Sequence, residues 1–552
     1  MKIRIRNYII ILIFTIILSI PMMLNDFNVY GDDGVQHISR LMGTAQSISE
    51  GQIIPVIMSN FCNGFGYSWN IFYSPVTAYI PLIFSIFTSS FELMFKLFTI
   101  LVVFLSGISM YEFVAKVTKN TNVGLLAAGV YIFSSYRFTD MYMRMAISEL
   151  SSFIFIPIVF HGMYNIFNGE EKDKKSLLLT LGAAGLIITH IVIAMYTAIF
   201  CFVYLLLNIK KLKDKQVIKS LGINIILILL LTSFYTIPML EHKVTTQYEV
   251  FKEGRMDIEE KLMLNKVDFK DLFYTEENNF CFEINLVILV GIVLTILAFK
   301  KIDKENRKIY WFSLISGIIC VIMSMRFFPF EKLPSILRML QFSFRLLEFS
   351  TFFFAFVASI NYSVIIKNFK IADTLVLCIV TFLLLCPAIQ KINFNKVWSE
   401  EKLWPAAEVN ENTGRVHAGC ATFEYLPSKA YDNLEYIKQR ENRTYILSGN
   451  VTIEKEEKNG TNMLIVVSNI ENDTSIELPY IYYLGYNVEL QYEAGNVQKI
   501  NTYESDNGFI AINLPEGEHG TITVQYTGTI LMKISYVVSI LTRLSFTCCC
   551  SI

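Results

Sequence analysis

The residues best suited to catalysis or metal binding lie in a polar stretch that begins with two adjacent aspartates. Asp32 and Asp33 are followed by His37, and Asp33 is suited to cap a helix that stops near Gly51. A spacing of four residues places Asp33 and His37 on one helix face. Carboxylates and an imidazole gathered at one point could bind a divalent cation or act as a general base. In the alternative interpretation, Asp33 only caps the helix, Asp32 is solvated and His37 faces lipid headgroups.

Further charged residues recur downstream between two apolar runs. Arg137, Asp140, Arg144 and Glu149 follow one another closely. Charges at membrane depth are costly, and they are usually paired or functional. Arg137 with Asp140, and Arg144 with Glu149, could be plain ion pairs. In the functional interpretation, an arginine here binds a phosphate group through two parallel hydrogen bonds.

Other polar residues interrupt later apolar segments. His190 falls at the tip of a predicted helical hairpin, where a single histidine is more often an interface residue than a catalyst, and Glu241 ends a long apolar run. Helical spacing places Arg338, Gln341 and Arg345 on one face of an apolar segment. That segment could instead be an interfacial helix whose arginines face headgroups. Taken together, these residues predict a site at one membrane face for a substrate that carries a phosphate.

The elements that must position these residues are apolar helices. Of the 552 residues, 53% are hydrophobic and 17% are charged, against roughly 25% charged in an average soluble domain. A spanning helix needs about 20 apolar residues, and the apolar runs of this sequence predict roughly 11–13 such helices. Orientation by charge requires the runs over 71–90 and 93–115 to cross only once together. One of them is therefore predicted to be broken or re-entrant.

Basic clusters give the predicted orientation. They lie at 2–6, 116–119, 172–175, 210–215, 300–308 and 367–370, and such clusters are retained in the cytoplasm. We therefore expect a multi-pass plasma-membrane protein with a cytoplasmic N-terminus and with the loop 25–70 outside. The net charge of −1 provides no basic field for nucleic acid. The sequence also lacks Walker A, GxGxxG, HExxH and GxSxG motifs, which argues against ATP-driven transport and against a nucleotide-sugar donor.

Three domains are predicted along the chain. Residues 1–392 form a transmembrane domain that includes the outside loop. From 393 to 528 the chain is polar, with alternating apolar residues between Gly, Asn and Asp turns, which favours an extracytoplasmic β-sandwich. Residues 529–552 are apolar again but are interrupted by Lys533 and Arg543. We interpret them as a C-terminal spanning helix with a truncated or altered end.

These features resemble the GT-C membrane glycosyltransferases. More closely, they resemble the YfhO-like bacterial proteins and the membrane family labelled 6-pyruvoyl-tetrahydropterin synthase-related. The matching pieces are the Asp32-Asp33 loop with His37, Asn63-Gly64-Phe65-Gly66, Phe72-Tyr73-Ser74-Pro75, Tyr136-Arg137 to Glu149, His190, Phe234-Tyr235 to Glu241, Gln341-Phe342-Ser343-Phe344-Arg345, and Pro479-Tyr480 with Tyr482-Tyr483-Leu484-Gly485-Tyr486. The second carboxylate that many GT-C enzymes carry in a later loop is not assignable here.

The resemblance implies a sugar transfer on the outer membrane face. The donor would be a polyprenyl-phosphate sugar, and the acceptor a cell-surface glycan or a teichoic-acid-like polymer. Asp32 or Asp33 would be the general base or a ligand to Mg²⁺ or Mn²⁺, and Arg137, Arg144 or Arg345 would bind the lipid phosphate. The rival interpretation is a membrane protein that is not an enzyme. It would be a transporter or flippase for a lipid-linked intermediate, or a scaffold for envelope assembly.

Overall fold

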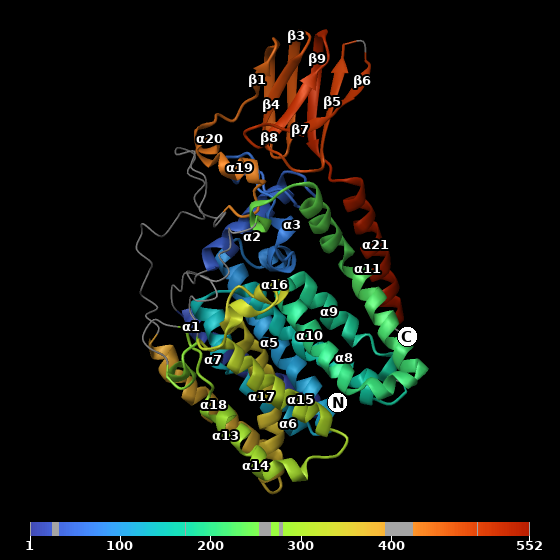
Figure 1. Ribbon diagram of the computed structural model, residues 1–552. Helices are drawn as coiled ribbons and strands as arrows, with labels where there is room; N and C mark the ends of the chain where they lie inside the picture. Colours follow the sequence, from blue (N-terminus) through green and yellow to red (C-terminus); the bar gives the residue numbers. More distant parts are fainter. Residues whose placement is uncertain are drawn as a thin grey trace. The chain divides into compact units, whose positions relative to one another are not determined.

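The computed structural model describes residues 2–24, 33–171, 173–252, 267–274, 280–391, 423–493 and 495–550. The chain divides into two compact units, whose elements are traced in Figure 1. The first unit comprises Met1–Gly34, Ile83–Leu230 and Asp257–Val397, and the second comprises Val35–Leu82, Leu231–Met256 and Trp398–Ile552.

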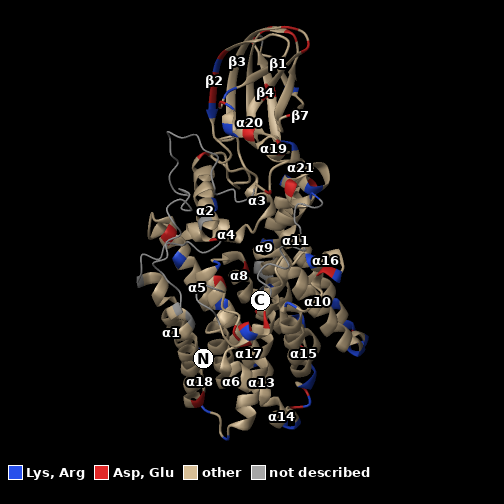
Figure 2. Ribbon diagram, turned by 60° about the vertical axis from the view of Figure 1, so that its left-hand side comes forward, with Lys and Arg blue, Asp and Glu red and all other residues tan. Residues whose placement is uncertain are grey.

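Apolar helices make up most of the first unit. They are α1 (Lys2–Leu24), α5 (Phe91–Thr118), α6 (Thr121–Ile132), α8 (Ile147–Asn168), α9 (Leu178–Thr189), α10 (Ile191–Leu207), α11 (Lys215–Thr245, which continues into the second unit), α13 (Leu286–Val293), α14 (Thr295–Ala298), α15 (Arg307–Ser324), α17 (Leu346–Ile365) and α18 (Ile371–Lys391). Charged residues are sparse along these helices and lie mainly near their ends (Figure 2). These helices confirm the predicted type of domain, a helical membrane domain.

Six helices in the described ranges are long and apolar enough to cross a membrane. They are Lys2–Met23, Phe91–Thr118, Ile147–Asn168, Lys215–Thr245, Arg307–Ser324 and Ser343–Ile365. Shorter apolar helices account for other predicted runs, namely Val76–Ile86, Thr121–Ile132, Ile191–Leu207 and Ile371–Pro387. Several predicted spans are therefore shorter than the roughly 20 residues that a straight crossing requires.

The apolar run over 71–90 is broken, as predicted for one member of that pair. It consists of α3 (Trp69–Phe72), α4 (Val76–Tyr79) and the 3₁₀ helix η1 (Pro81–Ile86). A proline has no backbone N–H and clashes with the preceding helical turn, so Pro75 and Pro81 restart the helix instead of continuing it. The following helix, α5, is unbroken for 28 residues.

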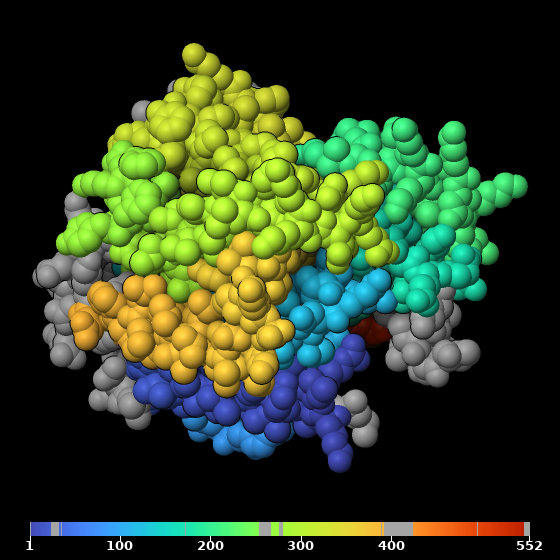
Figure 3. All heavy atoms as spheres, turned by 90° about the horizontal axis from the view of Figure 1, so that it is seen from below, coloured from blue at the N-terminus to red at the C-terminus, as the bar shows by residue number. Residues whose placement is uncertain are grey.

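Small residues allow helices of the first unit to pack closely. A Cβ atom added to Gly162 of α8 would lie 2.3 Å from the backbone nitrogen of Leu179 in α9, and one added to Gly182 would lie 2.6 Å from that of Val159. Helix backbones approach this closely only where glycine or another small residue lies between them. On the face seen in Figure 3, α18 lies between α1 and α13.

The second unit contains a C-terminal β-sheet domain, as predicted. Its strands are β1 (Tyr445–Ser448), β2 (Thr452–Asn459), β3 (Asn462–Ile470), β4 (Thr474–Ile481), β5 (Tyr486–Tyr492), β6 (Val497–Ile500), β7 (Thr502–Glu504), β8 (Phe509–Leu514) and β9 (Gly517–Tyr526). They form two antiparallel sheets with the orders β1-β4-β8-β7 and β2-β3-β9-β5-β6. Both sheets contribute to one hydrophobic core, which includes Ile465 of β3 and Ile512 of β8. The edge strand β2 carries five consecutive Glu and Lys residues, which oppose edge-to-edge association.

Helices complete the second unit. α2 (Gly34–Ser49) begins at the boundary between the units and ends before Gly51, whose φ of +96° suits a glycine after a helix. Two short helices, α19 (Ser428–Asp432) and α20 (Leu434–Gln439), precede the strands. The last helix, α21 (Ile530–Cys550), lies beside the C-terminal half of α11, where the Ser233 hydroxyl lies 2.8 Å from that of Ser539.

Candidate ion-pair site

Glu149 lies at the centre of a buried ionic network in the first unit. The connection between α6 and α8 ends in the π-helical turn η2 (Thr139–Met143), and Glu149 lies in the first turn of α8. Nη1 of Arg144 donates to Oδ1 of Asp140 at 2.6 Å and to Oε2 of Glu149 at 2.9 Å. The hydroxyl of Tyr136 donates to the other carboxylate oxygen of Glu149. The predicted pairing of Arg144 with Glu149 is therefore present, and it is one link of a larger network.

Arg345 joins this network from a segment 196 residues away in sequence. Its Nε donates to Oε2 of Glu149 at 2.9 Å, and its Nη1 donates to the carbonyl of Leu340 and to Oε1 of Gln341. The three residues predicted to share a helix face do not do so. The short helix α16 (Ser335–Arg338) ends at Arg338, and Gln341 has a φ of +69°, which breaks the helical path.

Arg137 does not pair with Asp140, contrary to the ion-pair interpretation. Its Nε donates to the carbonyl of Tyr131 at 3.0 Å, and its Nη1 donates to the hydroxyl of Ser106 at 2.8 Å. Its guanidinium lies 4.1 Å from the ring centroid of Phe153 and 4.6 Å from that of Tyr131. Its side chain is fully buried, and the groups that hold its guanidinium among the described residues are neutral acceptors and aromatic faces.

Glu348, in the first turn of α17, is a buried carboxylate that was not among the residues predicted from sequence. Its side chain is fully buried, and the hydroxyl of Ser152 donates to Oε1. Oε2 has no hydrogen-bond partner within the described part of the chain. The sequence does contain a signal for Glu348. It is a single carboxylate inside the apolar run that contains Phe352, Phe353 and Phe354, and an intramembrane ionisable residue is by default a functional candidate.

Asp33 lies next to the arginines of this network. Its backbone N–H donates to the carbonyl of Arg144 at 2.8 Å. Burial raises the pKa of Asp33 above its usual value, while the positive charges of Arg144 and Arg345 oppose this rise. Asp32 lies outside the described residues. Within the described ranges, no three His, Cys, Asp or Glu side chains form a group that could hold a metal ion.

His190 also belongs to this neighbourhood, at the tip of the predicted helical hairpin. It separates α9 from α10 and caps α10 by accepting the N–H of Ile193 on Nδ1. Burial lowers the pKa of His190 to about 3, and the charge of Arg345 lowers it further while Glu149 opposes this. The imidazole is therefore neutral at ordinary pH, which fits the structural and the catalytic interpretation alike.

His37 and Glu241 belong to the second unit. The side chain of His37 is 5% exposed, so it does not face lipid headgroups as its structural interpretation expected. Burial lowers its pKa to about 3, and the neighbouring charge of Arg40 contributes. Glu241 lies in α11, and its Oε2 accepts a hydrogen bond from the hydroxyl of Thr529.

Arg40 of α2 is a second residue that the sequence analysis missed. Its guanidinium donates to Oδ1 of Asn70 at 2.9 Å, to the hydroxyl of Thr77 at 3.2 Å and to the carbonyls of Tyr73 and Ser74. Burial lowers the pKa of Arg40 to about 10, which still leaves it charged at ordinary pH. Arg40 therefore holds the broken segment around α3 and α4 in place. A lone arginine within a helix carries no signal of this in the sequence.

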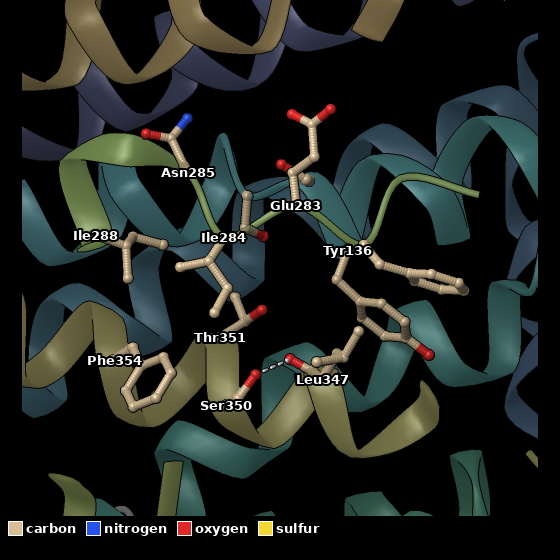
Figure 4. Close-up of a pocket in the computed structure, with 12 residues that line it drawn as sticks. Tyr136, Glu283, Ile284, Asn285, Ile288, Leu347, Ser350, Thr351 and Phe354 are labelled. Atoms are coloured by element: carbon tan, nitrogen blue, oxygen red, sulfur yellow. Dashed lines mark hydrogen bonds between the residues drawn. The ribbon is translucent and has the colours of Figure 1, made fainter. Parts of the chain in front are cut away.

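A small cavity adjoins the ionic network through Tyr136, one of its lining residues (Figure 4). Its volume is about 20 Å³, which is room for one water molecule or one hydroxyl group. Ile284, Ile288 and Phe354 form apolar walls, and Ser135 and Thr351 also line it. Both of these residues are more than nine-tenths buried. The cavity can thus accept a small polar group beside the charged residues.

Comparison with known proteins identifies the family. Residues 71–394 match the model of the 6-pyruvoyl-tetrahydropterin synthase-related domain, which is described as a membrane protein. A protein of Lactococcus lactis subsp. cremoris (strain MG1363), named only as uncharacterized, is 27% identical over 590 residues, which cover 99% of this chain and 94% of the relative. The family match spans more than half of the chain and includes the whole Tyr136-to-Glu149 stretch and Arg345. The chain therefore belongs to the 6-pyruvoyl-tetrahydropterin synthase-related family of membrane proteins.

Proposed function

We propose that this membrane protein transfers a sugar from a polyprenyl-phosphate donor to a hydroxyl group of a cell-envelope glycan or lipid. The reaction would take place on the outer membrane face, with the N-terminus in the cytoplasm and the β-sheet domain, built as a sandwich, outside. The observation that supports this best is the juxtaposition of Asp33 with Arg144 and Arg345. It combines a carboxylate that can accept a proton with two arginines that can bind a phosphate.

Asp33 would act as the general base in a single displacement. Its carboxylate takes the proton of the acceptor hydroxyl, and the acceptor oxygen bonds to the anomeric carbon of the donor. The bond from that carbon to the phosphate oxygen breaks, and polyprenyl phosphate leaves with the electron pair. The anomeric configuration is therefore inverted. A raised pKa brings the carboxyl closer to the range in which a base is most effective.

Arg144 and Arg345 would bind the donor phosphate and stabilise the charge that develops on it. In the protein alone, both guanidinium groups hydrogen-bond to Glu149, which holds their planes in place. This preorganisation avoids a reorientation of two long side chains when the donor arrives. The arginine held by neutral partners, Arg137, would support this arrangement without contacting the donor.

A transfer assay tests the proposal directly. Full-length protein in lipid nanodiscs would receive a panel of radiolabelled polyprenyl-phosphate sugars together with cell-envelope acceptor. Asp33→Asn should reduce label transfer by about 10²- to 10⁴-fold, the usual contribution of a general base, with unchanged thermal stability. Asp32→Asn should be assayed in parallel, because the sequence alone does not distinguish the two carboxylates.

Glu305→Gln is the matched control for the loss of a carboxylate charge. Glu305 is 56% exposed and faces Lys119 at 3.5 Å, so its loss should leave transfer unchanged. Equal transfer by the wild type and both aspartate variants would show that the base lies elsewhere. No transfer by a well-folded wild-type protein with any donor would contradict the glycosyltransferase proposal.

One observation favours a second candidate function, a carrier for a lipid-linked intermediate. Glu348 is fully buried within a spanning helix, and a single hydrogen bond from Ser152 is its polar contact in the described residues. Such intramembrane carboxylates mark proton or substrate pathways in transporters. Under this alternative, Glu348→Gln would abolish lipid translocation in proteoliposomes, whereas the transferase proposal expects no translocation by the wild type.

A further inference from the structure

Four large aromatic side chains of the first unit are exposed: three lie within residues 269–274, and Phe327 follows Arg326, whose guanidinium hydrogen-bonds to Asp268. Phe269, Phe273 and Tyr274 are 69%, 52% and 56% exposed, and Phe327 is 71% exposed. Phe269 and Phe273 also contact each other, with ring centroids 5.2 Å apart. These four residues are called the aromatic rim below. Single exposed apolar residues are ordinary, but a group of exposed aromatic rings marks an interaction surface.

The rim is joined by hydrogen bonds to the ends of apolar helices. Val267 pairs with Met325, the residue directly after the end of α15, and the N–H of Arg326 donates to the carbonyl of Val267 at 2.9 Å. On the other side, the N–H of Ile284 donates to the carbonyl of Leu272 at 2.8 Å, two residues before α13 begins. The rim is therefore held at the level where α15 ends and α13 begins.

Charged residues accompany the aromatic rings. Arg326 is exposed, and its guanidinium forms two hydrogen bonds to Asp268 at 2.7 and 3.1 Å. Lys270, in the 3₁₀ turn η6 (Phe269–Leu272), is also exposed. Aromatic rings together with basic side chains at the end of a spanning helix are typical of the membrane–water boundary. There the rings reach the upper acyl chains and the cations meet phosphate headgroups.

We propose that the aromatic rim inserts into the headgroup region of the lipid bilayer and is a lipid-binding surface of this protein. Its occupant is phospholipid, because the rim adjoins the end of α15, which is itself apolar enough to cross a membrane. The hydroxyl of Ser343 donates to the carbonyl of Ser324 at 3.1 Å, which ties the end of α15 to the start of α17. The rim thus sets the depth of the segment that carries Arg345. This inference does not depend on the proposed sugar transfer.

Photocrosslinking in proteoliposomes tests the proposal on the full chain. The photoreactive amino acid p-benzoyl-phenylalanine would replace Phe273 or Phe327, which preserves an aromatic ring at an already exposed position. The control places it at Tyr503 of β7, which is 39% exposed in the β-sheet domain. Vesicles of phosphatidylglycerol and phosphatidylethanolamine would carry a radiolabelled phosphatidylglycerol, and labelled lipid bound to protein would be measured after illumination.

We expect at least tenfold more lipid crosslinking at positions 273 and 327 than at position 503. Equal and low lipid labelling at all three positions would overturn the proposal. Crosslinking of a second protein chain in place of lipid would also overturn it, because the rim would then be a protein interface. Correct folding of each variant would be checked by an unchanged thermal unfolding midpoint before illumination.

Discussion

Replacing Glu149 by glutamine tests the central feature of the ion-pair site. The carboxylate of Glu149 is 1% exposed, and the paired side chains of Arg144 and Arg345 are 4% and 10% exposed. In Glu149→Gln, the shape is retained but one negative charge is lost. Arg144 keeps Asp140 as its counter-ion, whereas the remaining polar contacts of Arg345 are the neutral oxygens of Leu340 and Gln341.

The expected cost follows from the burial of the unpaired charge. Removing one partner of a buried ion pair costs about 3–5 kcal/mol, because the other charge stays buried without compensation. This corresponds to about a 10²- to 10⁴-fold change in the unfolding equilibrium constant. Equilibrium unfolding in mixed micelles by titration with dodecyl sulfate, monitored by tryptophan fluorescence, would measure the difference.

Glu348→Gln is the matched control in the same region. Glu348 is equally buried but forms no ion pair among the described side chains, and a glutamine can still accept the hydrogen bond of Ser152. Its cost should be no more than about 1 kcal/mol, the net value of an ordinary hydrogen bond. The reasoning would be refuted if Glu149→Gln were as stable as the wild type, or if both variants lost the same stability.

Three further predictions concern packing, the β-sheet domain and pH. Gly162→Ala should destabilise the protein by about 1–3 kcal/mol in thermal unfolding, because the new Cβ would lie 2.3 Å from a backbone nitrogen of α9, whereas Gly222→Ala meets no atom within 4 Å and should not destabilise it. Glu477→Gln leaves the fully buried guanidinium of Arg440 unpaired, so hydrogen exchange should report a β-sheet domain weakened by about 3–5 kcal/mol. The pKa of Asp33 is raised above 3.8, so kcat/KM for sugar transfer should fall as the pH decreases through this raised value and the base becomes protonated. The same fall of kcat/KM at low pH in Asp33→Asn would show that another group causes it.

Much of the architecture could be predicted from local sequence patterns. Apolar runs predicted the membrane helices, and period-two alternation after residue 393 predicted the β-sheet domain. These patterns are informative because burial of a helix face or a sheet face is decided by the spacing of nearby residues. The number of crossings that the charge distribution allows also predicted a break in one of the runs 71–90 and 93–115, but it did not say in which.

The membership of the ion-pair site could be predicted only in part. Arg144 and Glu149 are close in sequence, so their pairing could be anticipated. The sequence also suggested Arg137 as the partner of Asp140, but tertiary structure turns Arg137 toward Tyr131 and Ser106 instead. Sequence spacing alone does not say which of two nearby arginines reaches a carboxylate once a π-helical turn changes the register.

The sequence by itself determined that this chain is an apolar helical membrane protein with a polar β-rich region, since composition and periodicity act over a few turns or strands. Only the tertiary structure decided that Arg345 meets Glu149 across 196 residues of sequence, and that Glu348 is buried against Ser152. Such contacts depend on how separate helices pack. A buried charge without a partner is costly there, because the apolar interior offers it no water.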